Sequence, residues 1–145
     1  MIARILSVII LSGLSLCSYG QCEQRIKDFY VRYMQELEKP EKSAVLDSLC
    51  YAVIAPEMWS RFGEYAEKTG CDPMTRAQDV SQYGMDSLSV SSLGDGWYMV
   101  RYKWSEGSDY TEIPLKASCN DGEFRITYIT PLWLGTQYGD HLLDK

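Results

Sequence analysis

The chain has 145 residues, enough for one domain and too few for two of ordinary size. Its 20 acidic residues outnumber its 14 basic ones, which gives a net charge of −6 and disfavours nucleic acid as a partner. Because His141 is the single histidine, a zinc site of the usual Cys/His type is also disfavoured. We therefore expect neither a metal nor another cofactor.

Residues 1–20 have the pattern of a signal peptide. Arg4 is their only charged residue, and the apolar run over residues 5–16 is shorter than the roughly 20 residues that a membrane span needs. Ser18-Tyr19-Gly20 then places small residues at the two positions that a signal peptidase reads. We expect cleavage before Gln21, and therefore export to the periplasm or the cell surface.

Two alternatives to cleavage stay open. The first is an uncleaved N-terminal helix or anchor. The second is lipidation at Cys17, which is disfavoured because a lipobox has a small residue before the cysteine and Leu16 stands there. The mature chain, residues 21–145, would keep 13 basic and 20 acidic residues, for a net charge of −7. We expect it to form a single domain without a membrane span.

The mature chain would keep four cysteines, at positions 22, 50, 71 and 119 (Cys22, Cys50, Cys71 and Cys119). An even number of cysteines in an exported chain suggests two disulfides, for which three pairings exist. Four reduced, buried thiols are the alternative.

Three amphipathic helices are predicted in the first half of the mature chain. Apolar residues recur at spacings of three and four over residues 23–38, and Pro40 ends this helix because proline lacks the N–H that an interior turn requires. A second helix is predicted from Ser43, which can cap it. A third is expected to end at Gly70, and Pro56 either starts it or marks the bend into it.

The period changes in the second half, where residues 71–84 are typical of a loop. Four strands separated by Gly- and Asp-rich turns follow, over residues 87–93, 97–104, 110–118 and 123–130. Helices followed by hairpin-linked strands predict an α+β domain, with the helices on one face of an antiparallel sheet. Pro114 cannot donate a ladder hydrogen bond, which favours an edge position or a bulge at that point.

The second predicted strand has two unlike faces. One face carries Trp97, Met99, Arg101 and Lys103, and the other carries Tyr98, Val100, Tyr102 and Trp104. We expect the Tyr98 face to enter the helical core and the Trp97 face to lie on the open side of the sheet. Trp97, Arg101 and Lys103 are therefore candidate binding residues.

Three segments carry a resemblance to a known family. They are Ile26-Lys27-Asp28-Phe29-Tyr30-Val31-Arg32-Tyr33, Asp72-Pro73-Met74-Thr75-Arg76-Ala77-Gln78-Asp79-Val80 and Gly122-Glu123-Phe124-Arg125-Ile126-Thr127-Tyr128-Ile129. Over residues 23–130 the chain resembles exported bacterial proteins of unknown function with the nuclear-transport-factor-2-like (cystatin-like) cone fold, although that family usually has tryptophan where Phe124 stands. The resemblance implies a curved four-stranded antiparallel sheet wrapped around the first helix, with a hollow or a dimer surface on its concave side. It implies no activity.

Asp72 and Asp79 are the most suggestive carboxylates. Two carboxylates that converge in a cleft could exchange protons with a substrate. In the competing, structural interpretation, Asp72 caps the turn before Pro73 and Asp79 pairs with Arg76. We favour the structural interpretation.

The sequence favours an exported binding or protein-interaction domain over an enzyme, and neutralising an envelope toxin, as an immunity protein does, is one form of that role. The alternative is a small isomerase or lyase that uses an Asp/Tyr pair inside the cone. A structural accessory of an envelope complex is a third hypothesis. We expect the partner to be another protein or a small ligand, and a homodimer is a further alternative. Residues 131–145, which include Trp133 and Leu134, are expected to pack within the monomer.

Overall fold

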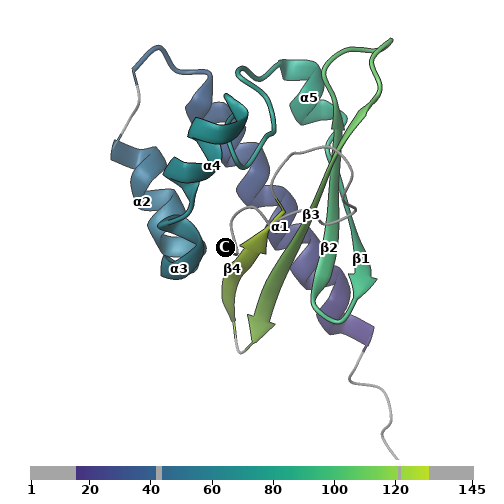
Figure 1. Cartoon of the computed structure of the whole chain (residues 1–145). Coiled ribbons are helices and arrows are strands. Elements are labelled where there is room, and N and C mark those ends of the chain that lie inside the picture. Colours follow the sequence, from purple (N-terminus) through teal and green to yellow (C-terminus); the bar gives the residue numbers. More distant parts are fainter. Residues whose placement is uncertain (1–15, 42–43, 121, 131–145) are drawn as a thin grey trace, which may run out of the picture.

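The computed structural model describes residues 16–41, 44–120 and 122–130. This part of the chain forms the predicted α+β fold, in which helices precede a curved antiparallel sheet of strand order β1-β2-β3-β4 (Figure 1). The elements are α1 (Leu16–Leu37), α2 (Ala44–Val53), α3 (Pro56–Trp59), α4 (Phe62–Thr69), α5 (Gln82–Asp86), β1 (Ser89–Gly94), β2 (Trp97–Lys103), β3 (Tyr110–Asn120) and β4 (Glu123–Ile129). The predicted cap at Ser43 and the segment 131–145 lie outside the described residues. Within that part of the chain, no helix is long and apolar enough to cross a bilayer.

The long helix α1 supplies one side of the core. Its predicted apolar stripe is buried, with Ile26, Tyr30 and Met34 at 0% exposure, because residues three and four apart share one helix face. The helix begins at Leu16, upstream of the expected cleavage before Gln21. Cleavage there would leave the buried stripe intact, and both cleavage and export stay predictions.

The predicted third helix is divided into α3 and α4 at Ser60 and Arg61. The amide of Arg61 bonds to the carbonyl of Met58, three residues back, which tightens the turn and separates the two helices. Gly70 ends α4 with a φ of 68° and donates its N–H to the carbonyl of Ala66, as the sequence predicted.

The segment expected to be a loop ends in the short helix α5, so the prediction for residues 82–84 was wrong. Ser81 caps this helix by accepting a hydrogen bond from the amide of Gly84, and its hydroxyl also donates to the carbonyl of Trp104. A Cβ at Gly84 would lie 3.3 Å from the ring of Tyr102. Contact with β2 holds this turn, and a local pattern does not reveal such a contact.

The two faces of β2 lie as the sequence predicted, except that Trp104, expected on the core side, follows the end of the strand and is 45% exposed. Tyr98, Val100 and Tyr102 are buried on the helical side, and the residues between them are half-exposed. The hydroxyl of Tyr102 donates to the carbonyl of Thr75 at 2.6 Å, which joins the sheet to the loop before α5.

Pro114 lies in β3, between β2 and β4, so the edge position that was one of its two predictions is wrong. Its carbonyl accepts bonds from the amide and hydroxyl of Thr130, so its nitrogen faces the same side, just beyond the last paired residues of β4. The proline nitrogen cannot return a bond to the carbonyl of Thr130, and Arg76 donates to that carbonyl instead. A bulge does occur nearby, between Lys116 and Ala117, where β4 carries the extra residue Thr127.

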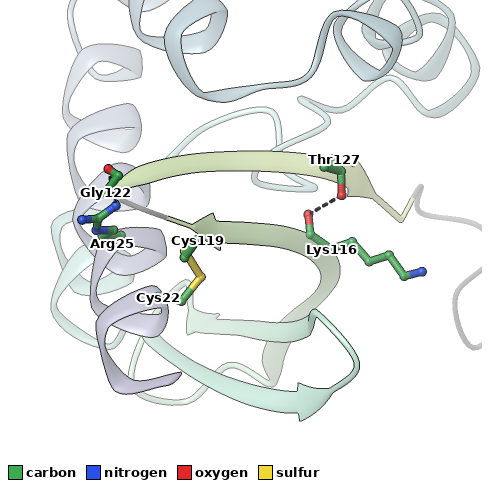
Figure 2. The surroundings of a disulfide bond; sticks show 6 residues. All are labelled: Cys22, Arg25, Lys116, Cys119, Gly122 and Thr127. Atoms are coloured by element: carbon green, nitrogen blue, oxygen red, sulfur yellow. Dashed lines mark hydrogen bonds between the residues drawn. A yellow bond between two sulfur atoms is a disulfide. The ribbon is translucent and has the colours of Figure 1, made fainter. Parts of the chain in front are cut away.

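One disulfide, between Cys22 and Cys119, joins the first turns of α1 to the end of β3 (Figure 2). The two Cα atoms lie 5.7 Å apart. Beside it, Arg25 donates to the carbonyl of Gly122 at 2.6 Å, so the same helix also holds the β3–β4 hairpin. The expected second disulfide is not formed, because Cys50 and Cys71 are free thiols. Cys50 is buried on the inner side of α2, where a thiol packs as a small apolar group.

Candidate functional site

The sheet face opposite the helices, here called the open face, gathers aromatic and cationic side chains. The open face comprises Trp97, Met99, Arg101 and Lys103 of β2, Tyr110, Glu112, Pro114 and Lys116 of β3, and Tyr128 of β4. Strand register places these side chains together, since residues of one parity share one face and paired residues stand opposite each other. The three β2 residues predicted to bind, Trp97, Arg101 and Lys103, are among them.

The first group on this face, the Trp97 cluster, joins three strands. The rings of Trp97 and Tyr128 meet edge to face with their centroids 5.8 Å apart. The ammonium of Lys116 lies 5.1 Å from the centroid of the Trp97 ring. Lys116 is paired with Trp97 on one side and with Tyr128 on the other, so the sheet register holds all three.

The second group, the Tyr110 cluster, places two cations on one ring. The guanidinium carbon of Arg101 lies 4.4 Å from the centroid of the Tyr110 ring, and the ammonium of Lys103 lies 4.8 Å from it. Glu112 stands opposite Arg101, with its Oε1 2.9 Å from the Arg101 Nε. That Nε makes no hydrogen bond, so the contact is an ion pair that lacks hydrogen-bond geometry. About half of each charged side chain is exposed, 42% of Arg101 and 50% of Glu112.

The open face is basic, although the chain as a whole is acidic. Its nine residues include three cations and one anion, which are Arg101, Lys103, Lys116 and Glu112. At the hairpin end of β4, Arg125 and Glu123 add one charge of each sign. Net charge therefore misrepresents the chemistry of this surface.

Residues of β3 and β4 complete the face, and sequence reasoning missed them. Lys116 alternates with the buried residues Leu115 and Ala117, so the strand pattern carried a signal for it, whereas Tyr110 and Tyr128 lack such a clean alternation. Their meeting depends on the register across two hairpins and on the bulge at Thr127, which the sequence pattern did not fix.

A hollow of about 350 Å³ adjoins the Tyr110 cluster. It is lined by Arg76, Tyr110, Thr111 and Glu112, at the edge of β3 that extends beyond β4. A second hollow, of about 410 Å³, lies between α1 and α2 and is lined mainly by small and apolar residues such as Ala44, Leu49 and Ala52. Neither hollow is lined by Asp72 or Asp79.

Asp72 is not part of the open face and has the structural role expected for it. Its Oδ1 accepts bonds from the amides of Met74 and Thr75, and its Oδ2 accepts a 2.6 Å bond from the hydroxyl of Tyr33. Burial raises the pKa of the Tyr33 phenol far above its usual value, and the charge of Asp72 raises that pKa further. An Asp/Tyr pair therefore exists inside the fold, but its carboxylate is engaged in holding a loop.

Asp79 is exposed, and its side chain accepts a hydrogen bond from the amide of Val80. Arg76, the partner predicted for Asp79, is bonded to β3 and to Thr130. The guanidinium of Arg76 donates to the carbonyl of Glu112 at 2.7 Å and to the carbonyl and hydroxyl of Thr130. Its backbone has a φ of 57°, which is uncommon for a residue with a side chain. The segment that carries the family resemblance before the sheet thus fastens its loop to the ends of β3 and β4.

Metal chemistry finds no support in the described part of the chain, where no three His, Cys, Asp or Glu side chains are placed to hold an ion. No protein-family model matches the chain, and no curated protein is similar to it in sequence.

Two solved structures resemble this fold. One is a chain of the type VI native effector–immunity complex Tae3–Tai3 from Ralstonia pickettii, with a TM-score of 0.56 and 14% identity over 79% of this chain and 97% of that chain. At that identity the likeness shows the fold alone. The other is a protein of unknown function from Bacteroides thetaiotaomicron VPI-5482, with a TM-score of 0.71. It is 32% identical over 78% of this chain and 91% of that one, and the chain therefore belongs to the same family as this Bacteroides protein of unknown function.

Proposed function

We propose that this protein is an exported interaction domain that binds another protein through the open face of its sheet. One observation carries the proposal: tryptophan, tyrosine and arginine side chains, the residues that dominate binding energy at protein interfaces, gather on the face that the helices leave uncovered. The surrounding lysines and Glu112 supply the polar rim that such interfaces have.

Export is supported by the disulfide together with the N-terminal pattern. Disulfides persist in oxidising compartments and are rare in the cytoplasm. Cys22 follows the expected cleavage site by one residue, so the bond to Cys119 would hold the new N-terminus against the sheet. A mature chain that begins at Gln21 would therefore start in an ordered helix.

The specific form we propose is neutralisation of a toxic effector in the cell envelope. The fold likeness to a chain of an effector–immunity complex supports this form. Neither Asp72 nor Asp79 supports the alternative of an isomerase or lyase, because Asp72 is bonded to its own loop and Asp79 faces solvent.

The test is affinity purification of the tagged full-length chain from its native envelope, followed by mass spectrometry. We expect one partner to be retained by the wild type and reduced at least about tenfold by Trp97→Ala or Arg101→Ala, the loss typical of interface hot spots. Tyr51→Ala is the matched control, because Tyr51 is an aromatic residue of α2 with 64% exposure. Equal retention by the wild type and by both face variants would refute the proposal.

Thermal unfolding of each variant must accompany this experiment. Trp97 packs against Tyr128, so its removal costs some stability as well as contact area. Arg101→Ala removes an exposed ion pair and is expected to change stability by less than about 1 kcal/mol. If both variants lose the partner while Arg101→Ala still unfolds at the wild-type temperature, the loss of binding is due to the changed open face and not to unfolding.

A further inference from the structure

We infer that the Tyr110 cluster is a carboxylate-binding subsite, and that the partner contributes an acidic segment to the open face. This inference rests on the proposed function and adds the chemistry of the partner. It depends on the balance of charge around one ring, on the weak hold of Glu112 and on the hollow beside them.

The first step is the unbalanced charge. Arg101 and Lys103 both lie within 5 Å of the centroid of the Tyr110 ring, so two positive charges are held close together on one face. Like charges on a shared surface repel, and Glu112 balances one of the two. The register fixes this arrangement, because Lys103 stands opposite Tyr110 and Arg101 opposite Glu112. A second carboxylate, brought by a partner, would complete the balance.

The second step is that Glu112 is poorly held. Its carboxylate is half exposed, and it meets the Nε of Arg101 without forming a hydrogen bond there. A partner carboxylate could instead engage the guanidinium through two parallel bonds, the geometry that arginine favours. Glu112 would therefore compete with a partner carboxylate for the guanidinium of Arg101.

The third step is the room for a neighbouring side chain. The hollow of about 350 Å³ is lined by Tyr110 and Glu112 of the open face together with Thr111 and Arg76. A segment that places one carboxylate between Arg101 and Lys103 could set its next outward side chain in this hollow. The site therefore suits an extended acidic segment better than a single free anion.

An acidic protein segment is favoured over nucleic acid. The Tyr110 cluster supplies two cations, whereas a phosphate backbone requires a long basic track. The helical side of the molecule carries Glu57, Glu64 and Glu67, and the net charge of −6 repels an extended polyanion. A short segment with one or two carboxylates avoids most of that repulsion.

The test is an NMR titration of the ¹⁵N-labelled protein with a short Asp/Glu-containing peptide, since this method measures weak binding residue by residue. We expect shifts at Arg101, Lys103 and Tyr110 that weaken as salt is raised. Glu112→Gln should tighten binding about threefold, and Arg101→Gln or Lys103→Gln should weaken it by at least about as much, the range of exposed ion pairs. Lys27→Gln on α1 removes the same charge elsewhere and should change nothing.

Several outcomes would overturn the inference. One is equal binding of the matching Asn/Gln peptide, and another is weaker binding after Glu112→Gln. Equal competition by inorganic phosphate or by a short single-stranded DNA would show a general anion site and overturn the acidic segment as occupant. The capture experiment separates the two proposals. A captured partner that depends on Trp97, with no peptide binding, would leave the proposed function standing, whereas peptide binding without such a partner would refute the proposed function alone.

Discussion

Replacing both cysteines of the disulfide, as Cys22→Ser with Cys119→Ser, should remove a large share of the folding free energy. The bond closes a loop of 97 residues, and the loop-entropy model assigns such a closure about 4.7 kcal/mol. Domains of this size are stable by about 5–15 kcal/mol, so the variant would be marginal. The midpoint of thermal unfolding should fall by roughly 15–20 °C.

The assay is urea denaturation followed by tryptophan fluorescence, with and without a reducing agent. Reduction should destabilise the wild type to the level of the double-serine variant and should leave that variant unchanged. Cys71→Ser is the control for loss of a thiol outside the bond. A difference below about 1 kcal/mol between oxidised wild type and variant would refute the reasoning, because it would mean that the linkage does not restrict the unfolded chain.

Three further predictions concern the loop before α5 and its surroundings. Arg76→Lys should lower the free energy of unfolding by about 1–3 kcal/mol in urea denaturation, because an ammonium cannot reproduce the forked bonds to Glu112 and Thr130; an unchanged value would contradict this. Asp72→Ala should cost about 2–3 kcal/mol in the same assay by leaving the Tyr33 hydroxyl and two loop amides without their acceptor, and Asp72→Asn, which keeps one oxygen, should cost less. Burial and then the charge of Asp72 raise the pKa of the Cys50 thiol from 9.0 to about 12, so its contribution to stability is present below pH 9 and is lost as the pH rises toward 12. Cys50→Ala should flatten that decline in pH-dependent unfolding, and rapid alkylation of Cys50 in the native protein at pH 9 would contradict the assignment.

Elements with a long, strong pattern could be predicted from the sequence. The spacing of Ile26, Tyr30 and Met34 predicts an amphipathic helix whose apolar side faces the core, and all three side chains are buried. The faces of β2 were also predictable, since alternation with period two leaves two choices and the tyrosine-rich face is the more apolar. The composition of residues 71–81 correctly indicated a loop, in which Asp72 has the predicted structural role.

Features that depend on contacts between distant segments could not be predicted. α5 is one turn with Gly84 inside it, and its contact with Tyr102 has no local signature. Pairing of Cys22 with Cys119 requires the place of α1 beside the β3–β4 hairpin, which spacing alone does not give. The assignment of the fold to the nuclear-transport-factor-2-like group stays a prediction.

The candidate site shows the same division. Trp97, Arg101 and Lys103 were predicted because they share one strand, on which alternation alone decides the face. Tyr110 and Glu112 were missed because they come from the next strand, and only the register brings them opposite Lys103 and Arg101. Net charge could not reveal a basic face, since it sums over surfaces that point in different directions.

The most direct test of the central claim is hydrogen–deuterium exchange of the protein alone and in complex with its captured envelope partner. Binding through the open face predicts slower exchange over residues 97–116, which cover β2 and most of β3, and unchanged exchange over α2. Protection confined to α2 and the hollow beside it, with β2 and β3 unchanged, would contradict the account.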